Sequence, residues 1–162
     1  MNYSQKYCLV VFFQRLDIDT EFNMTEWPLH ITVADVFDID ITKLLRDELT
    51  RIVDKALPLI VTAGDRTVLG NTKVVLINKS DAIVQIHYLL IDCLIKYGAV
   101  FNTPKFNKDG FIPHSTIQKT TRLNFGDNVT LNIISLVDMF PNANHERRKI
   151  LYNFNGSSHS NK

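Results

Sequence analysis

The chain has 162 residues, of which 45% are hydrophobic and 22% charged, and its formal net charge at pH 7 is +1. These proportions are typical of a soluble globular protein and argue against a disordered or fibrous one. A net charge so close to zero also gives no reason to expect attraction of the whole molecule to nucleic acid.

The charges are distributed unevenly along the chain. Residues 17–54 carry ten acidic and three basic side chains, whereas residues 96–122 carry five basic ones and the single acid Asp109. Each charge taken alone fits ordinary solvated surface. As a set, the basic stretch is where we expect an anion-binding face.

The two cysteines, Cys8 and Cys93, each lie in an apolar run and form no CxxC pair, so we expect small buried thiols. The N-terminus lacks the charged and apolar segments of a secretory signal, and no apolar run approaches the roughly 20 residues of a membrane span. The sequence therefore predicts a cytoplasmic protein that makes no membrane contact.

The first half of the chain predicts several strands and one helix. The helix, over residues 41–56, has Asp40 as its cap, a stripe of apolar residues that includes Leu44 and Leu45, and Pro58 as its stop. The β-rich runs that predict strands are 7–13, 27–37, 59–62, 67–69 and 73–77.

The second half predicts another helix, a long loop and more strands. The helix covers residues 81–97, with Ser80 as its cap and Gly98 at its end. The residues expected on its apolar stripe are Ile83, His87, Leu90, Ile91 and Leu94. A loop over 99–111 then leads to strands over 113–120, 129–140 and 149–154.

Each half thus contains strands and one long amphipathic helix, so we expect two similar halves that face one another. The apolar content ends near residue 155. We expect a single bilobal domain over 1–155 and a disordered polar tail over 156–162.

One short pattern occurs in both halves. His30-Ile31-Thr32 and His114-Ser115-Thr116 lie 84 positions apart, each in a strand-like segment and each close behind a proline. Side chains at i and i+2 of a strand point to the same face, so each histidine projects with its threonine. If the halves pack symmetrically, two imidazoles and two hydroxyls converge on one cavity. The alternative is that they are edge-strand residues with satisfied polar tips.

Such a group of side chains suits the chemistry of a phosphodiester. An imidazole, with an ordinary pKa of about 6.5, can take a proton from the attacking oxygen or give one to the departing oxygen. The hydroxyls of Thr32 and Thr116 can donate to the phosphoryl oxygens, and Lys119 can add a cation. The residues do not decide which of His30 and His114 is the base and which the acid.

The pattern histidine, hydrophobic residue, threonine, hydrophobic residue, found twice, resembles the 2H phosphoesterase superfamily, the LigT-like proteins. The resemblance covers nearly the whole chain. It implies an α+β bilobal fold with pseudo-two-fold symmetry, in which two antiparallel sheets line a central cleft and helices lie outside. It also implies action on nucleoside 2′,3′-cyclic phosphates, 2′,5′-linked nucleotides or RNA ends without a metal, and a basic residue at the position of Lys119.

The chain departs from that family pattern at two positions. Ser115 stands where the family has an apolar residue, which weakens packing behind the site. Asp35 follows the first motif and is unexpected in a positive cleft. If its side chain points into the cleft, it restricts which anions are accepted.

Aromatic residues are the candidates for holding a nucleobase. Phe106 lies in the long loop between Lys105 and Lys108, a mixture that can stack a base and hold its phosphates. Phe111, next to the second motif, is more typical of a loop anchor. Tyr7 and Phe37 are further candidates for the lining of the cleft.

The other histidines do not extend the predicted site. His87 lies on an apolar helical stripe and is expected in or near the core, whereas His145 and His159 are expected to be bystanders. There is no metal-ligand spacing and no glycine-rich phosphate loop, so neither a metal nor a cofactor is predicted.

The sequence predicts a monomeric enzyme whose partner is a nucleotide or RNA substrate. Two alternatives stay open. One is a module that binds RNA ends or nucleotides in the same cleft without turnover, and the other is an interaction protein in which the two motifs coincide by chance.

Overall fold

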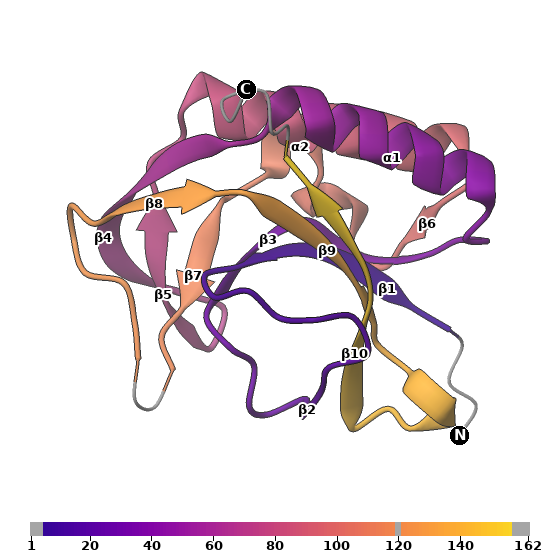
Figure 1. Ribbon diagram of the computed structural model, residues 1–162. Coiled ribbons are helices and arrows are strands. Elements are labelled where there is room, and N and C mark those ends of the chain that lie inside the picture. Colours follow the sequence, from indigo (N-terminus) through magenta and orange to yellow (C-terminus); the bar gives the residue numbers. More distant parts are fainter. Residues whose placement is uncertain (1–4, 119–120, 157–162) are drawn as a thin grey trace.

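Two antiparallel sheets and two long helices make up the part of the chain that the computed structural model describes, residues 5–118 and 121–156 (Figure 1). The six-stranded sheet consists, in spatial order, of β2 (Glu21–Asn23), β10 (Arg147–Asn155), β9 (Ile133–Asp138), β1 (Tyr7–Phe12), β3 (His30–Asp38) and β6 (Val100–Phe101). The four-stranded sheet consists of β7 (His114–Thr116), β5 (Thr72–Ile77), β4 (Leu59–Leu69) and β8 (Asn128–Leu131).

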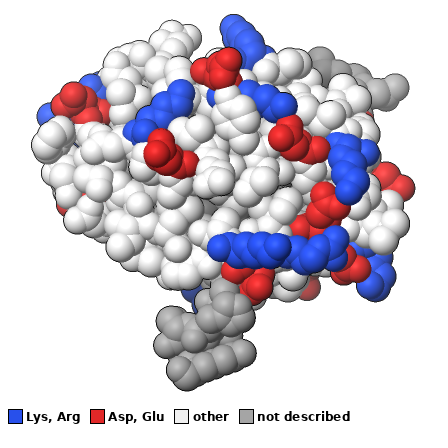
Figure 2. Space-filling model, turned by 90° about the horizontal axis from the view of Figure 1, so that it is seen from above, with Lys and Arg blue, Asp and Glu red and all other residues white. Residues whose placement is uncertain are grey.

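The helices α1 (Lys43–Ala56) and α2 (Asp81–Lys96) lie side by side along one side of the molecule, outside the sheets (Figure 1). This arrangement is the expected α+β fold of two antiparallel sheets with helices outside. Seen from the helical side, basic and acidic side chains are mixed over the surface (Figure 2). Neither helix in the described part of the chain is long and apolar enough to cross a membrane.

Helix α1 begins two residues later than predicted. The hydroxyl of Thr42, not the carboxylate of Asp40, caps it by accepting a hydrogen bond from the Leu45 N–H at 3.1 Å. Leu45, Leu49 and Val53 are its buried residues, spaced by one turn each. Leu44, expected on the apolar stripe, is instead 68% exposed.

Helix α2 follows the prediction closely. Ser80 caps it through a hydrogen bond from the Ile83 N–H at 3.4 Å. The whole predicted stripe is buried, including His87. Gly98, just after the helix, has a φ of +89°, a conformation that glycine adopts without a steric penalty.

Several strand predictions were wrong in detail. Residues 59–69 form one irregular strand, β4, with a register shift between Ala63 and Arg66, instead of two pieces around a turn. The predicted strand over 129–140 divides into β8 and β9, which belong to different sheets. The short strands β2 and β6 were not predicted, because two or three residues give no periodicity to detect.

The main core fills the space between the helices and the sheets. It contains Leu9 and Val11 of β1, Ile31 of β3, and the buried faces of both helices. A smaller cluster, centred on Cys8 and Val10, lies on the other face of β1. The six-stranded sheet is therefore buried on both faces near its centre, which explains the continuous apolar run of β1.

Both cysteines are buried and unpaired, as predicted. Burial raises the pKa of the Cys8 thiol to about 12, and that of the Cys93 thiol to about 12 as well. Neither thiol is therefore a reactive thiolate at neutral pH.

Candidate active site

The two sheets meet where β3 and β7 are in contact. Strand β6 pairs with Phe37 and Asp38 at the far end of β3, so it does not reach the part of β3 near His30. Strand β7 is itself the edge of the four-stranded sheet. His30 is the first residue of β3 and His114 the first residue of β7, so the contact brings together strands from the two halves of the chain.

Alternation along each strand separates buried from partly exposed side chains. Ile31 and Val33 are buried, whereas His30 and Thr32 are partly exposed on the other face of β3. On β7 the buried residue is Ser115, between the partly exposed His114 and Thr116. The predicted pairing of each histidine with its threonine on one face is therefore present.

A cavity of about 510 Å³ opens between the sheets and combines residues from both of them. The residues that line it are Thr32, Val33, Asp35, Val68, Leu69, Gly70, Thr72, Val74, His87, Phe106, Phe111, Ile112, His114 and Thr116. Three of the four predicted catalytic residues are thus in its wall. His30 lies beside it, near enough for the charge of His114 to affect its pKa.

Both motif histidines are held by the same local hydrogen bond. Nδ1 of His30 lies 2.8 Å from the carbonyl oxygen of Pro28, and Nδ1 of His114 lies 2.7 Å from that of Ile112. A carbonyl oxygen only accepts, so each Nδ1 carries a proton and donates it. In the neutral ring Nε2 is then the basic nitrogen, the one that can accept a proton.

The surroundings of His30 are aromatic. Its ring centroid is 4.6 Å from that of Trp27 and 5.8 Å from that of Phe12. Burial is the largest effect on the pKa of His30 and lowers it; the hydrogen bond to Pro28 acts in the opposite direction, and His114 lowers the pKa further. His30 is therefore neutral at pH 7.

His87 is the third histidine at the cavity, and it is a core residue as predicted, only 1% exposed. Its Nδ1 donates to the Val33 carbonyl oxygen at 2.7 Å, and its Nε2 accepts from the Lys108 N–H at 2.8 Å. Burial lowers its pKa. That it joins β3 to the long loop was not predicted, because periodicity places a residue on a helical face without naming its partners.

The aromatic residues of the long loop occupy two different environments. Phe106 lines the cavity with 44% of its surface exposed, and the amine of Lys105 lies 5.4 Å from its ring centroid. Phe111 is buried and stacks on His87 with ring centroids 3.8 Å apart. The expectation that Phe111 anchors the loop is confirmed.

Tyr7 and Phe37, two of the predicted substrate-binding residues, lie away from the cavity. In the register of β1 and β3, Tyr7 pairs with Phe37 at one end and Phe12 with His30 at the other. Phe37 is fully buried in the main core, at 0% exposure, and Tyr7 packs against it. Neither lines the cavity, because both lie at the end of the sheet away from the motif. Lys119 lies outside the described residues.

One wall of the cavity is formed by residues that the sequence did not point to. The hairpin between β4 and β5 contributes Val68, Leu69, Gly70 and Thr72 to the lining. Gly70 has a φ of +58°, which suits the tight turn. Strands over 67–69 and 73–77 were predicted, but the position of their hairpin in the cavity wall depends on how the two sheets pack.

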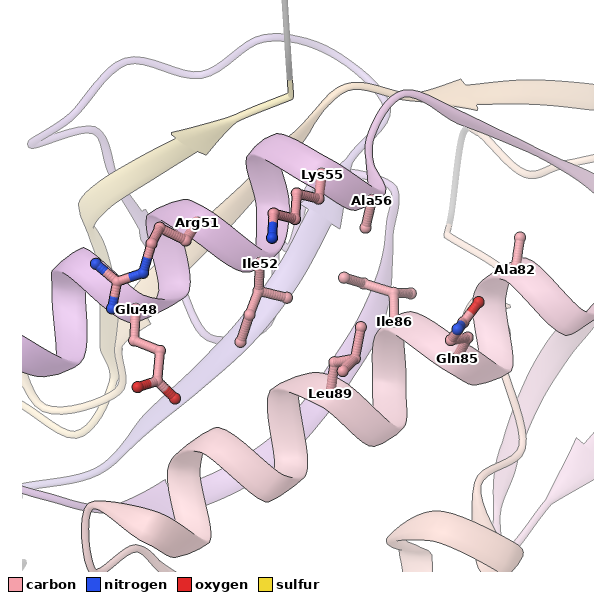
Figure 3. Close-up of a pocket in the computed structure, with 9 residues that line it drawn as sticks. All are labelled: Glu48, Arg51, Ile52, Lys55, Ala56, Ala82, Gln85, Ile86 and Leu89. Carbon is pink, nitrogen blue, oxygen red and sulfur yellow. The ribbon is translucent and has the colours of Figure 1, made fainter.

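A second hollow, of about 570 Å³, lies on the outer side of the molecule between α1 and α2 (Figure 3). Its lining residues are Glu48, Arg51, Ile52, Lys55, Ala56, Ala82, Gln85, Ile86 and Leu89. None of them belongs to either motif, and charges of both signs surround it. The cavity between the sheets is therefore the candidate active site.

Comparison with solved structures identifies the same fold in other proteins. A crystal structure described as a phosphoesterase is 11% identical and has a TM-score of 0.58, with 95% of this chain and 99% of that one covered. E. coli LigT in its apo form is 11% identical with a TM-score of 0.53, covering 95% and 98%. E. coli LigT complexed with 3′-AMP is 10% identical with a TM-score of 0.55, covering 95% and 99%.

These identities are low, so the structural likeness shows the fold alone. No curated protein matches the sequence. The sequence does match the 2′-5′ RNA ligase superfamily over residues 12–138, a span that includes both motifs and most of the domain. The chain therefore belongs to the 2′-5′ RNA ligase superfamily.

Proposed function

We propose that this protein is a phosphodiesterase that hydrolyses nucleoside 2′,3′-cyclic phosphates or 2′,5′-phosphodiester bonds, with His30 and His114 as its acid–base pair. The observation that carries the proposal is the matched hydrogen bonding of the two rings. Each Nδ1 donates to the carbonyl two residues earlier, which leaves each Nε2 available for proton transfer.

The two histidines take different roles because their environments differ. His30 is packed among aromatic rings, and its lowered pKa keeps it neutral, as a general base must be. His114 lines the cavity and acts as the general acid in its protonated form.

In the proposed step, Nε2 of His30 takes a proton from water while the water oxygen forms a bond to phosphorus. The bond from phosphorus to one ribose oxygen breaks, and that oxygen receives the proton from Nε2 of His114. One water is consumed and a phosphomonoester results. Exchange of protons with solvent then returns both rings to their starting states.

The threonines stabilise the charge that develops during this step. Thr32 and Thr116 lie on the same strand faces as the histidines, and both line the cavity. Their hydroxyls donate to the non-bridging oxygens, which become more negative as the fifth bond to phosphorus forms. Lys119 stays a predicted source of positive charge for this step, and it lies outside the described residues. Acid, base and hydrogen-bond donors are all side chains of this protein, so the proposed step draws on no metal.

The rest of the cavity suits a nucleoside. Its volume of about 510 Å³ is within the range of small-molecule sites, and most of its wall is apolar. The exposed ring of Phe106 is available to stack on a base. The E. coli LigT structures include complexes with 3′-AMP and with phosphate, which supports a nucleotide ligand here.

The test is hydrolysis of 2′,3′-cyclic AMP and of 2′,5′-linked diadenosine in the presence of EDTA. We expect wild-type turnover, and a loss of about 100-fold or more in kcat for His30→Ala and for His114→Ala. The control is His145→Ala, a change in a surface turn that should leave kcat unaltered. Undiminished turnover in either motif variant contradicts the proposal. Salt-dependent binding of the nucleotide without any product favours the binding module instead.

A further inference from the structure

The segment from residue 102 to residue 113, here named the wall loop, forms one side of the candidate active site. Phe106, Phe111 and Ile112 of this loop line the cavity. The loop leads directly into β7, and its Ile112 carbonyl oxygen is the group that accepts from His114. The position of the loop therefore sets both the apolar wall and the orientation of the His114 ring.

The wall loop is tightly folded and locally strained. It contains two short 3₁₀ turns, η1 (Pro104–Phe106) and η2 (Lys108–Gly110). A Cβ atom on Gly110 would lie 1.7 Å from the Lys105 carbonyl oxygen, so only glycine fits there. Lys108 has a φ of +58°, a left-handed conformation that is energetically costly for a residue with a Cβ atom. Contacts from outside the loop must offset that cost.

His87 supplies those contacts from α2. Its Nε2 accepts a hydrogen bond from the N–H of Lys108, the strained residue itself, at 2.8 Å. Its ring lies flat on Phe111, with centroids 3.8 Å apart and planes inclined by 3°. One side chain thus holds the loop at two points, one at the first residue of η2 and one three residues before His114.

The other nitrogen of His87 is bonded to the first motif strand. Nδ1 donates at 2.7 Å to the carbonyl oxygen of Val33, which follows Thr32 directly. Because β6 pairs with β3 only at Phe37 and Asp38, no β6 strand competes for that carbonyl. His87 therefore links the strand that carries His30 and Thr32 to the loop that precedes His114 and Thr116.

We propose that His87 is a positioning residue, which holds the wall loop against β3. It thereby sets the shape of the nucleotide cavity and the orientation of the His114 ring. This inference rests on the proposed function. A histidine that merely filled the core would be replaceable by phenylalanine at no cost to substrate affinity. His87 uses both ring nitrogens to join backbone groups of two elements, each of which carries part of the site.

The arrangement works only while His87 is neutral. Protonation of Nε2 removes the acceptor for the Lys108 N–H, and the imidazolium would be buried beside an apolar ring. The titratable or charged residues at the cavity, or in contact with the groups that His87 touches, include Lys79, Tyr88, Asp92, Lys108, Asp109, Asp35 and His114. Helix α2, strand β3 and the wall loop also carry Asp81, Lys96, His30, Asp38 and Lys105. Lys79 opposes the charged form, and Lys108 is paired with Asp92 at 2.7 Å. We therefore expect the wall loop to loosen as the pH falls below about 6.5.

The test compares His87→Phe and His87→Gln with the wild type. Phenylalanine keeps a ring to stack on Phe111 but makes neither hydrogen bond. Glutamine offers an amide oxygen that can accept from the Lys108 N–H, and it does not titrate. The matched control is Tyr88→Phe, which removes a different link between α2 and the wall loop, the hydrogen bond from Tyr88 to Asp109.

Two measurements are made on each variant. The first is amide hydrogen exchange at Lys108 by NMR, at pH 7.5 and pH 5.5, expressed as a protection factor so that the intrinsic pH dependence is removed. The second is kcat and KM for 2′,3′-cyclic AMP. We expect His87→Phe to lose most of the Lys108 protection and to raise KM about tenfold, with kcat changing less. His87→Gln should retain most of the Lys108 protection and a KM close to that of the wild type. Tyr88→Phe should resemble the wild type in both quantities.

If His87→Phe fails to fold, the pH dependence of the Lys108 protection factor still tests the proposal. Protection of Lys108 should fall between pH 7.5 and pH 5.5 in the wild type and stay constant in His87→Gln. The positioning role is overturned if that protection is independent of pH, or if it is lost in a folded variant while KM does not change. Absence of wild-type turnover refutes the proposed function alone. The dissociation constant for 3′-AMP, read from the fluorescence of Trp27, then takes the place of KM with the same expected direction.

Discussion

The imidazole of His30 packs against the indole of Trp27, with ring centroids 4.6 Å apart and ring planes inclined by 34°. This contact shields the ring from water and favours its neutral form, because a desolvated cation is costly. It gives a structural reason for His30 rather than His114 to be the base.

The contact predicts how the pH profile responds to Trp27→Ala. Burial lowers the pKa of His30, so the base form persists below the ordinary value of about 6.5. Without the indole, water reaches the ring and the pKa rises back toward that value. The acid limb of kcat/KM should therefore move to higher pH, whereas Trp27→Phe, which keeps an aromatic cover, should shift it less. An unmoved acid limb in Trp27→Ala contradicts this account.

Removal of the motif hydroxyls tests their role in stabilising the transition state. Thr32→Val and Thr116→Val keep the shape of the side chain, and each should lower kcat about 100-fold with little change in KM, because the lost hydrogen bond strengthens only during the reaction. Thr72→Val is the control, since Thr72 lines the same cavity from β5 outside the motifs. Steady-state kinetics decide the matter, and a change in KM alone would indicate a role in ground-state binding only.

Asp35 places a negative charge in the wall of a cavity proposed to bind an anion. Its carboxylate lines the cavity and accepts a hydrogen bond from the Val36 N–H at 2.9 Å. Asp35→Asn keeps that acceptor and removes the charge. We expect KM to fall about three- to tenfold for 2′,3′-cyclic AMP carrying an additional 5′-phosphate, and to change less for the unphosphorylated substrate. Equal effects on both substrates would show that Asp35 does not discriminate by charge.

Ser115 is predicted to reduce stability rather than to act in the site. Its hydroxyl is buried, and it has no hydrogen-bond partner within the described part of the chain. Ser115→Ala should raise the free energy of unfolding by about 1 kcal/mol, since an unsatisfied polar group is removed. Ser135→Ala is the matched control and should lower it, because the buried Ser135 hydroxyl donates to Asn153 at 2.5 Å. Urea denaturation of both variants measures whether the free energy of unfolding rises or falls.

Part of this structure could be predicted from interactions between residues that are close together in the sequence. The apolar stripe of α2 and its Ser80 cap follow from helical periodicity and hydrogen bonding within one turn. The pairing of His30 with Thr32, and of His114 with Thr116, follows from the alternation of a strand. These features depend on residues a few positions apart, so no knowledge of the rest of the chain was needed.

The errors have a common origin in contacts between distant segments. Phe37 was predicted to line the cleft. The register that pairs it with Tyr7 places it instead in the core, at the end of β3 opposite His30. The split of residues 129–140 into β8 and β9 depends on which sheet each piece joins. Periodicity is the same in either sheet, so the sequence pattern does not distinguish the two outcomes.

The contact between Trp27 and His30 shows the same difference between what short-range and long-range contacts determine. By itself the sequence determined that His30 shares a strand face with Thr32, because that geometry is built into the extended backbone. Only the tertiary structure decided that an indole packs against the ring, that the strand of His114 contacts the strand of His30, and that His87 joins β3 to the wall loop. Those relationships come from the packing of two sheets and a helix, which brings together side chains that lie far apart in the chain.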